Sequence, residues 1–314
     1  MTKDIPLVSV IVSTYKSQWD KIRKTLYSIL QQDNTIFEII ICDDGSPDNY
    51  FERIEDYFSK SCFSNYLLLK HNQNQGTVKN YLDGLKHAKG KYVKAISPGD
   101  FLYDKNTLQL FVQYAELHPA DAYFGKAIYY NIIDNNIHIF DDVHNPRDLS
   151  PWINKDKRKI RYNYIRKSDY IVGASFFVKK DTQLNYLLRI EDKIKYAEDY
   201  SFVMMIAEGR NIEFINKPVI FYEYGTGIST NGQSIWKQYL LQDDLNALQL
   251  IWPSLSLAEK LEKKQNKRMD EKIMRYILTP KLIFLRFGIK NTPPKIKFPY
   301  TDNDYSNLIK ILNS

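Results

Sequence analysis

The chain has 314 residues, of which 44% are hydrophobic and 26% charged, a composition that excludes a fibrous or disordered protein and allows a full hydrophobic core. Its 44 basic and 37 acidic residues give a net charge of +7, which favours an anionic substrate or surface as a partner. It contains two cysteines, Cys42 and Cys62, too few for a disulfide-stabilised scaffold or a cysteine-based zinc site.

We expect no segment that directs the chain into or across a membrane. The first residues, "MTKDIPLVSVIVSTY", lack the order of basic, apolar and small residues that marks a signal peptide. No uncharged apolar run approaches the roughly 18–20 residues that a transmembrane helix needs. We therefore expect a cytoplasmic protein. Because the chain has more basic than acidic residues, we also consider peripheral contact with the inner membrane surface.

The first hundred residues alternate between apolar strands and amphipathic helices. Runs rich in Val, Ile and Leu predict buried strands at residues 7–15, 37–46, 65–71 and 89–97. Helical spacing of apolar residues predicts helices at residues 18–32, 47–60 and 75–88. This alternation predicts an α/β protein with a doubly wound, mostly parallel sheet and helices on both of its faces.

The pattern changes after residue 104. The sequence predicts a helix at residues 106–119, strands at 122–131, 136–140, 170–178 and 212–224, and a further helix at 197–209. From about residue 234 the pattern is helical throughout, which predicts a C-terminal helical appendage packed on the α/β body. We therefore divide the chain into an α/β domain over residues 1–233 and a helical extension over residues 234–314.

Polar side chains follow three of the predicted strands where each strand ends. Thr14 and Tyr15 follow the first strand, Asp43 and Asp44 end the second, and Asp100 follows the fourth after a Ser-Pro-Gly turn. The carboxyl ends of strands in a doubly wound sheet can meet at one crevice. Carboxylates there can accept hydrogen bonds from a nucleobase and a ribose, whereas a diphosphate would need a cation. The glycine-rich phosphate motifs GxxxxGK[ST] and GxGxxG are absent.

Four blocks of the sequence carry a family resemblance: "VSVIVSTYKS", "EIIICDDGSPD", "NQGTVKNYLDGLKHAKGKYV" and "ISPGD". In this order and spacing they resemble the motifs of bacterial family-2 inverting glycosyltransferases, which have the GT-A fold. The resemblance covers residues 6–105 and continues more loosely through "AEDYSF" and "YEYGTGIST". It implies a catalytic domain with a nucleotide-sugar half over about residues 1–105 and an acceptor half over about 106–233.

The resemblance assigns nucleotide-binding roles to the first strand ends. It implies that Thr14 and Tyr15 line a uridine pocket, and that Asp44, or less favourably Asp43, contacts the uracil or the ribose. Lys79 stands where the family usually has Arg, which implies a place near the base or the diphosphate. A solvated position on the helix face is the alternative for this lysine.

The resemblance also implies a metal ligand and a catalytic base. Asp100 matches the last acid of the family's metal-binding motif, but Pro98 and Gly99 stand where the family has an earlier Asp. We therefore expect Mn²⁺ or Mg²⁺ to be held by Asp100 and phosphate oxygens, weakly in the absence of nucleotide. Asp199 matches the general base, with Glu198 beside it; a charge favourable to a helix N-terminus is the alternative for Asp199.

The implied function is transfer of a hexose or N-acetylhexosamine from a UDP-sugar to a hydroxyl of a glycan or glycoprotein, by metal-assisted direct displacement. Two alternatives stay open at this point. One is a nucleotidyltransferase, which would need a phosphate-binding loop after the first strand. The other is a catalytically weak, glycosyltransferase-like module that binds a glycan or a partner. Nucleic acid is not an expected partner, because the basic residues do not alternate with aromatic ones on a recognisable nucleic-acid-binding motif.

Two segments carry much of the basic charge. Residues 154–167 include seven basic residues and one acidic residue, and residues 257–290 include ten and four. We expect the first segment to form a mobile cover over the diphosphate or part of the acceptor groove. Apolar positions in the second favour a homo-oligomer formed through the C-terminal helices; they are Ile273, Ile277, Leu278, Leu282 and Leu285.

Overall fold

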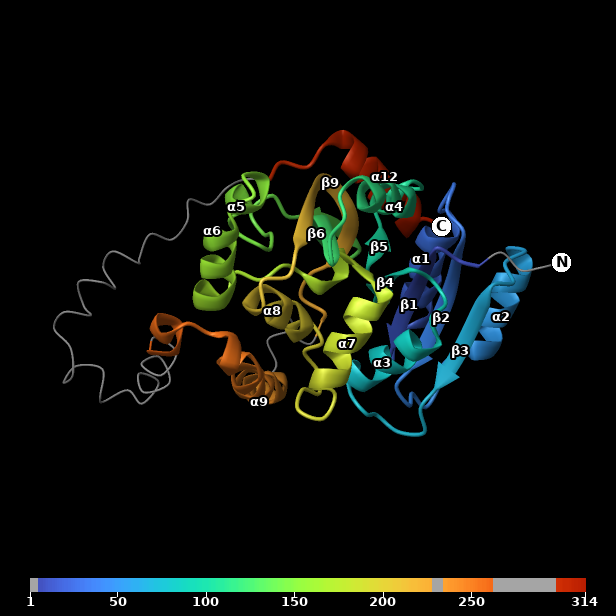
Figure 1. Ribbon diagram of the computed structural model, residues 1–314. Helices are drawn as coiled ribbons and strands as arrows, with labels where there is room; N and C mark the ends of the chain where they lie inside the picture. The colour runs from blue at the N-terminus through green and yellow to red at the C-terminus, as the bar shows by residue number, and fades with distance from the viewer. Residues whose placement is uncertain (1–4, 228–233, 262–297) are drawn as a thin grey trace.

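The computed structural model describes residues 5–227, 234–261 and 298–314, which are coloured in Figure 1. The strands are β1 (Val8–Thr14), β2 (Phe37–Asp43), β3 (Tyr66–Lys70), β4 (Tyr92–Ile96), β5 (Phe101–Leu102), β6 (Ala122–Ile133), β7 (Asn136–Ile139), β8 (Phe176–Lys179) and β9 (Ile212–Glu223). The helices are α1 (Trp19–Leu30), α2 (Phe51–Lys60), α3 (Thr77–His87), α4 (Thr107–Leu117), α5 (Ser150–Ile153), α6 (Lys157–Arg161), α7 (Lys180–Ile190), α8 (Tyr200–Ala207), α9 (Ser234–Ile251) and α12 (Asp302–Leu312). Short π- or 3₁₀-helical turns lie at Tyr162–Arg166, Gly173–Ser175 and Trp252–Ser254.

These strands form one sheet in the order β3-β2-β1-β4-β8-β6-β9-β5, with β7 paired to β6 outside this path. The neighbours β3, β2, β1 and β4 run parallel, as the sequence predicts. Beyond β4 the sheet is mixed: β8 is antiparallel to both β4 and β6, and β9 is parallel to β6. β6 and β7 are joined by a tight hairpin, in which Asp134 and Asn135 both have positive φ.

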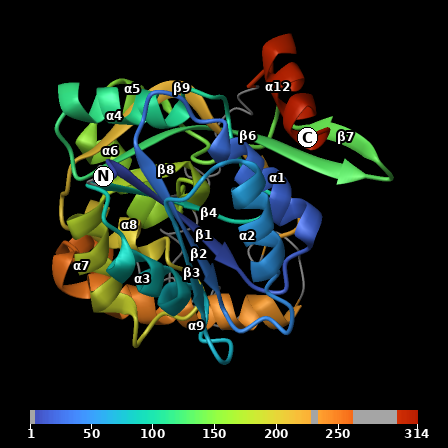
Figure 2. The same cartoon turned by 90° about the vertical axis from the view of Figure 1, so that its right-hand side faces the viewer.

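Helices cover both faces of the sheet because its central strands are apolar on both sides. In β1, Val10 and Val12 contact one helix layer, and Ile11 between them contacts the other. The first layer consists of α1, α2 and α4, and the second of α3, α7 and α8. Figure 2 shows strands β1 to β4 between α1 and α2 on one side and α3 and α7 on the other.

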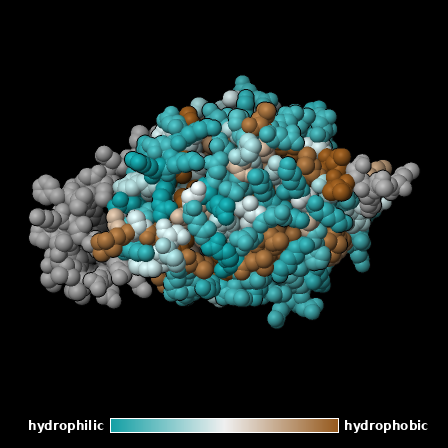
Figure 3. Space-filling view, viewed as in Figure 1, coloured by the Kyte–Doolittle hydropathy of each residue, from teal (hydrophilic) through white to brown (hydrophobic). Residues whose placement is uncertain are grey.

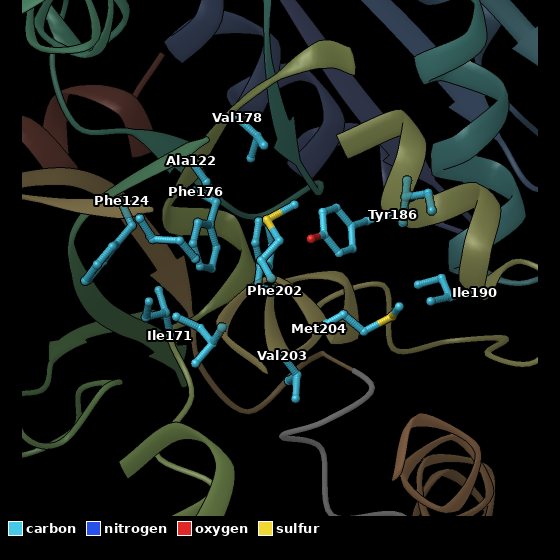
Figure 4. Packing of buried hydrophobic residues seen from close by; sticks show 14 of the residues in the cluster. Ala122, Phe124, Ile171, Phe176, Val178, Tyr186, Ile190, Phe202, Val203 and Met204 are labelled. Atoms are coloured by element: carbon cyan, nitrogen blue, oxygen red, sulfur yellow. The ribbon is translucent and has the colours of Figure 1, made fainter. Parts of the chain in front are cut away.

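The second helix layer is joined to the sheet by large side chains (Figure 4). Phe176 of β8 stacks on Phe202 of α8, with ring centroids 3.5 Å apart, and Phe124 of β6 packs against Phe176. Tyr186 of α7 belongs to the same buried cluster and points toward it. This packing fixes the first turn of α8, and therefore the residues just before it, relative to β8 and β6.

Two elements begin much later in the chain than the sequence predicts. The helix predicted from residue 47 begins at Phe51. The side chains of Asp48 and Asn49 each accept a hydrogen bond from the backbone amide two residues later and hold a turn instead. The strand predicted over residues 170–178 begins only at Phe176, after the turn Gly173–Ser175. Residues 170–175 are therefore free to form part of a cavity wall.

The first basic segment folds as α6 and the π-helical turn Tyr162–Arg166, and its apolar residues are buried. Arg161 forms two hydrogen bonds of 3.0 Å with the carboxylate of Glu259 and donates to the carbonyl oxygen of Ala207 at 2.6 Å. Arg161 thus ties the segment to α8 and to the chain after α9. This packing does not support our expectation of a mobile cover.

The C-terminal helices pack on the α/β body at two separate places (Figure 1). Ala247 and Ile251 of α9 are buried with α8 in the second helix layer. Leu308 and Ile311 of α12 are buried against β5, β6 and β9. The boundary at residue 233 remains a prediction, and the apolar positions proposed for oligomerisation, from Ile273 to Leu285, lie outside the described residues.

The face of the molecule in Figure 3 is largely hydrophilic, with hydrophobic residues in scattered groups. Among the residues that the structure describes, no helix is both long enough and apolar enough to cross a membrane.

Candidate active site

The carboxyl ends of β1 and β4 open onto a cavity of about 580 Å³. Its far wall is built by residues 168–174, by the residues before α8, and by the end of β9. Six of the eight site residues predicted from the sequence line this cavity: Thr14, Tyr15, Asp44, Asp100, Glu198 and Asp199. The fold therefore brings together residues that are separated by almost two hundred positions in the sequence. The two others, Asp43 and Lys79, lie outside its lining.

Asp43 holds the turn after β2. Its carboxylate accepts hydrogen bonds from the backbone amide and the hydroxyl of Ser46, both at 2.7 Å, and from the hydroxyl of Thr14 at 2.9 Å. Ser46 in turn accepts a hydrogen bond of 2.7 Å from the amide of Lys16. Asp43 and Ser46 thereby join the ends of β1 and β2 and fix the position of Tyr15, whose ring is 40% exposed at the cavity.

Asp44 connects the end of β2 to the start of α3. Its two carboxylate oxygens accept hydrogen bonds from the amides of Gln75 and Gly76, at 2.8 and 2.9 Å. Nδ1 of His71 lies 3.1 Å from Oδ1 of Asp44. His71 is a contact that the sequence analysis missed, and the signal for it is its place directly after β3, the strand next to β2. Asp44 is thus held rigidly at the cavity wall.

Lys79 lies in the first turn of α3 and is not part of the cavity lining. Its ammonium group is 3.7 Å from Oδ1 of Asp192, and its side chain is 42% exposed. Lys79 therefore lies at a solvent-exposed position on the helix face, which is the alternative given in the sequence analysis.

Asp100 closes the tight turn that follows β4. Its amide donates to the carbonyl oxygen of Ser97 at 2.9 Å, and Gly99 has a φ of +102°, which favours glycine. Oδ1 of Asp100 accepts a hydrogen bond of 3.1 Å from the amide of Glu223. Burial raises the pKa of the Asp100 carboxyl to about 7, against the opposing effects of the Glu223 amide and of Lys94. Within the described residues, Oδ2 of Asp100 accepts no hydrogen bond.

Lys94 is a buried charged residue in the centre of β4 that the sequence analysis did not single out. Its side chain is 0% exposed, and its ammonium group donates to the carbonyl oxygens of Ala95, at 2.9 Å, and Ala174. Burial lowers the pKa of Lys94 to about 7, and the nearby Asp100 opposes this shift. Lys94 thus connects β4 to the segment that leads into β8.

Glu198 and Asp199 form an acidic pair immediately before α8. Both line the cavity and are otherwise surrounded by protein, so desolvation raises the pKa of each carboxyl. The amide of Gly173 donates to Asp199 and favours its ionised form. The negative charge of Asp199 raises the pKa of Glu198 further. Asp199 is therefore the member of the pair that ionises more readily and can accept a proton at neutral pH.

The chemistry of Asp100 suits a hard divalent cation. Mg²⁺ and Mn²⁺ prefer oxygen ligands, and they often use one or two carboxylates together with phosphate oxygens and water. The described part of the chain holds no group of three or more His, Cys, Asp and Glu side chains arranged around a metal position. A cation at Asp100 would therefore depend on oxygen atoms that a bound diphosphate supplies.

Aromatic side chains form the cavity wall beyond the acidic pair. Tyr196 and Trp236 both line the cavity, and their rings meet edge to face with centroids 5.3 Å apart. Tyr239 of α9 packs against both rings and is 44% exposed. The sequence analysis missed this wall, because Tyr196 and Trp236 lie 40 residues apart and meet only when α9 packs on α8.

Comparison with known proteins gives matches of sequence and of fold. The model of the family "Glycosyl transferase family 2" matches residues 9–184. The glucosyltransferase WfgD of Escherichia coli, named as UDP-Glc:alpha-D-GlcNAc-diphosphoundecaprenol beta-1,3-glucosyltransferase, is 25% identical over 76% of this chain and 85% of its own length. The uncharacterised glycosyltransferase MG060 of Mycoplasma genitalium is 32% identical over 37% of this chain, and the chain spans only 39% of that relative.

Two solved structures share the fold at low sequence identity. TarS 1–349 of Staphylococcus aureus in complex with UDP has a TM-score of 0.53 at 19% identity, covering 81% of this chain and 68% of TarS 1–349. The mannosyltransferase PcManGT of Pyrobaculum calidifontis in complex with GDP-Man and Mn²⁺ has a TM-score of 0.52 at 17% identity, covering 98% and 85%. These similarities confirm the predicted GT-A fold.

Proposed function

Because the chain belongs to glycosyl transferase family 2, we propose that it transfers a sugar from a UDP-sugar to a hydroxyl group of an acceptor, with inversion at the anomeric carbon. The observation that carries this proposal is that one cavity is lined by Tyr15 and Asp44 from the ends of β1 and β2, by Asp100 after β4, and by Asp199 before α8. Such an arrangement can hold a nucleotide, a diphosphate and an attacking hydroxyl in that order.

The donor is proposed to lie against the ends of β1 and β2. Tyr15 is exposed at the cavity and offers a ring face on which a uracil can stack. Asp44 is already positioned by two backbone amides, so little conformational freedom is lost when its oxygens accept a further hydrogen bond from the nucleoside. TarS, a structural neighbour, has been solved with UDP and with UDP-GlcNAc, which supports a UDP donor carrying a hexose or N-acetylhexosamine.

The diphosphate is proposed to lie beside Asp100. A bound Mn²⁺ or Mg²⁺ would supply positive charge that stabilises the departing nucleoside diphosphate. Asp100 lines the cavity, and the described residues leave its Oδ2 without a hydrogen-bond donor, which suits this role. The Mn²⁺ complex of PcManGT supports a divalent cation as cofactor.

Asp199 is proposed to be the catalytic base. It takes the proton of the acceptor hydroxyl as that oxygen bonds to the anomeric carbon, while the bond from that carbon to the diphosphate oxygen breaks. The displacement occurs in one step, so no enzyme nucleophile is needed. Burial and the negative charge of Asp199 raise the pKa of Glu198, so the role of base is not assigned to Glu198.

The acceptor is proposed to be a hydroxyl of a glycan or a glycoprotein that enters over Tyr196 and Trp236. Aromatic faces stack well on the apolar faces of sugar rings, and these two lie next to the acidic pair. WfgD is named for a diphosphoundecaprenol-linked acceptor, and a lipid-linked acceptor would bring this chain to a membrane surface. Cytoplasmic location with peripheral membrane contact therefore remains part of the proposal.

A UDP-release screen over nucleotide sugars with Mn²⁺ tests the proposed function. We expect one UDP-sugar to be hydrolysed or transferred by the wild type and turnover to fall sharply in Asp199→Asn. A matched control is Asp181→Asn, which makes the same change at a carboxylate whose side chain is 93% exposed. If the protein binds UDP but no donor turns over under any condition, the catalytically weak binding module becomes the better account.

A further inference from the structure

The carboxylate of Glu223, the last residue of β9, lies against the turn that precedes Asp100. A Cβ atom built on Gly99 would overlap Oε2 of Glu223. The carboxylate of Glu223 therefore occupies space that any other residue at position 99 would fill with its own side chain. Pro98 and Gly99 stand where the family resemblance leads us to expect another Asp before Asp100.

Strand pairing places Glu223 here. β5 and β9 are antiparallel with Phe101 opposite Phe221, and continuing this register by two residues puts Gly99 opposite Glu223. The amide of Glu223 donates to Oδ1 of Asp100 at 3.1 Å, and the hydroxyl of Tyr130 donates to the carbonyl oxygen of Gly99 at 2.5 Å. The backbone of the turn and the end of β9 are thus held together, with both carboxylates lining one cavity.

A positive charge already lies against this carboxylate. Nζ of Lys21, in α1, is 2.5 Å from Oε2 of Glu223, and the hydroxyl of Thr226 donates to the same oxygen at 3.0 Å. The Glu223 side chain is 10% exposed and that of Lys21 is 31% exposed. The site therefore accommodates a cation beside Glu223, and the nine-tenths buried Asp100 presents an oxygen without a donor among the described residues.

We propose that Glu223 is the second protein ligand of the divalent cation, replacing the carboxylate that Pro98 and Gly99 cannot supply, and that Lys21 neutralises Glu223 when no metal is bound. This inference rests on the proposed function, since the diphosphate and water would complete the coordination. Two carboxylates with phosphate oxygens and water are a ligand set that Mg²⁺ and Mn²⁺ use. No group of three protein ligands is needed.

A purely structural ion pair between Lys21 and Glu223 is the alternative, and two variants separate it from the proposal. Glu223→Gln removes the negative charge and keeps the shape of the side chain and its hydrogen bond to Thr226. Lys21→Met removes the positive charge and leaves the carboxylate in place. A structural ion pair predicts that both variants lose stability alike and bind metal like the wild type. A metal ligand predicts that only Glu223→Gln loses metal.

The test measures bound Mn²⁺ by electron paramagnetic resonance in the presence of saturating UDP, with the melting temperature of each variant as a check on folding. We expect Glu223→Gln to raise the Mn²⁺ dissociation constant by about 10-fold or more, and Lys21→Met to leave it unchanged or lower it. Glu223→Asp keeps the charge on a shorter side chain and is expected to fall between the wild type and Glu223→Gln.

Wild-type affinity for Mn²⁺ in folded Glu223→Gln would overturn the inference and leave the proposed function standing. Wild-type UDP binding that does not change when Mn²⁺ is replaced by a chelator would overturn the inference and the proposed metal cofactor, but not the proposed sugar transfer from a UDP donor. A failure of the wild type to bind UDP with or without Mn²⁺ would instead overturn the proposed function. Calorimetric titration of UDP into the protein with Mn²⁺ and with chelator distinguishes these results.

Discussion

The backbone amide of Gly173 donates a hydrogen bond to the carboxylate of Asp199, and a Cβ atom on Gly173 would overlap that same carboxylate. The proposed base is therefore placed by a residue that lies 26 positions earlier in the chain and carries no side chain. Asp199 is held at the cavity because a glycine leaves room for it.

Gly173→Ala is expected to displace the proposed base without unfolding the protein. The added methyl group meets only the end of the Asp199 side chain, which can rotate away at little cost in stability. Since a positioned general base contributes about 10²- to 10⁴-fold to rate, donor turnover should fall by about 100-fold or more. The check is turnover of the UDP-sugar beside the melting temperature. Wild-type turnover in Gly173→Ala would show that the position of Asp199 does not matter for the reaction.

The rate of turnover should depend on pH through the acidic pair. Burial raises the pKa of Asp199, and the base must be ionised, so kcat/KM should increase with pH through a midpoint above the ordinary range of an Asp carboxyl, about 3.9. Glu198→Gln resembles the protonated Glu198 and should retain this limb with a smaller loss of rate than Asp199→Asn. A pH profile in which Asp199→Asn keeps the limb and Glu198→Gln loses it would reverse the two roles.

The free energy of unfolding should change with pH above neutrality because Lys94 is buried. Its pKa is lowered from 10.5 to about 7 in the folded protein, so between these values the unfolded chain binds the proton and the folded protein does not. The free energy of unfolding should therefore rise with pH across that interval, by at most about 1.4 kcal/mol per pH unit. Because other groups titrate there too, the measurement is the difference between wild type and Lys94→Met in urea unfolding at several pH values. Parallel pH curves for the two proteins would mean that Lys94 is charged in the folded state.

Gly99→Ala should lower stability more than the same change at Gly209. Both glycines have positive φ, +102° and +75°, which strains an alanine by about 1–3 kcal/mol. The added methyl at Gly209 meets nothing within 4 Å, whereas at Gly99 it overlaps the carboxylate of Glu223. The difference between the two variants in chemical unfolding therefore measures the contact with Glu223. Equal losses would show that Glu223 moves aside freely.

The first hundred residues could be predicted well because their signals are local. The apolar runs and helical periodicities placed four parallel strands and three helices, and the polar residues after β1 and β4 are at the cavity. Asp100 is indicated by its place after a predicted strand, and Asp199 only by its resemblance to a sequence motif; that both line one cavity follows from the fold. The two-residue strand β5 was missed, because so short a strand has no periodicity of its own.

The parts of the site that were missed depend on contacts between distant segments. Glu223 belongs to a strand whose sequence predicts only burial, and it meets Gly99 through the pairing of β5 with β9. Lys94 is one of many lysines, and only the packing of the segment 170–175 over β4 shows that it is buried. Asp43 and Asp44 are neighbours in the sequence but have different roles in the structure. Asp43 accepts a hydrogen bond from the amide of Ser46 and holds a turn, whereas Asp44 accepts one from the amide of Gly76 and lines the cavity.

The most direct test of the central claim is the anomeric configuration of the sugar that the enzyme first releases. In the absence of acceptor, water can take the place of the attacking hydroxyl, and proton NMR distinguishes the two anomers of the free sugar before they interconvert. From a UDP-α-sugar that the protein hydrolyses, direct displacement assisted by Asp199 predicts that the β-anomer appears first and that Asp199→Asn releases almost none. Initial release of the α-anomer by the wild type would contradict the account.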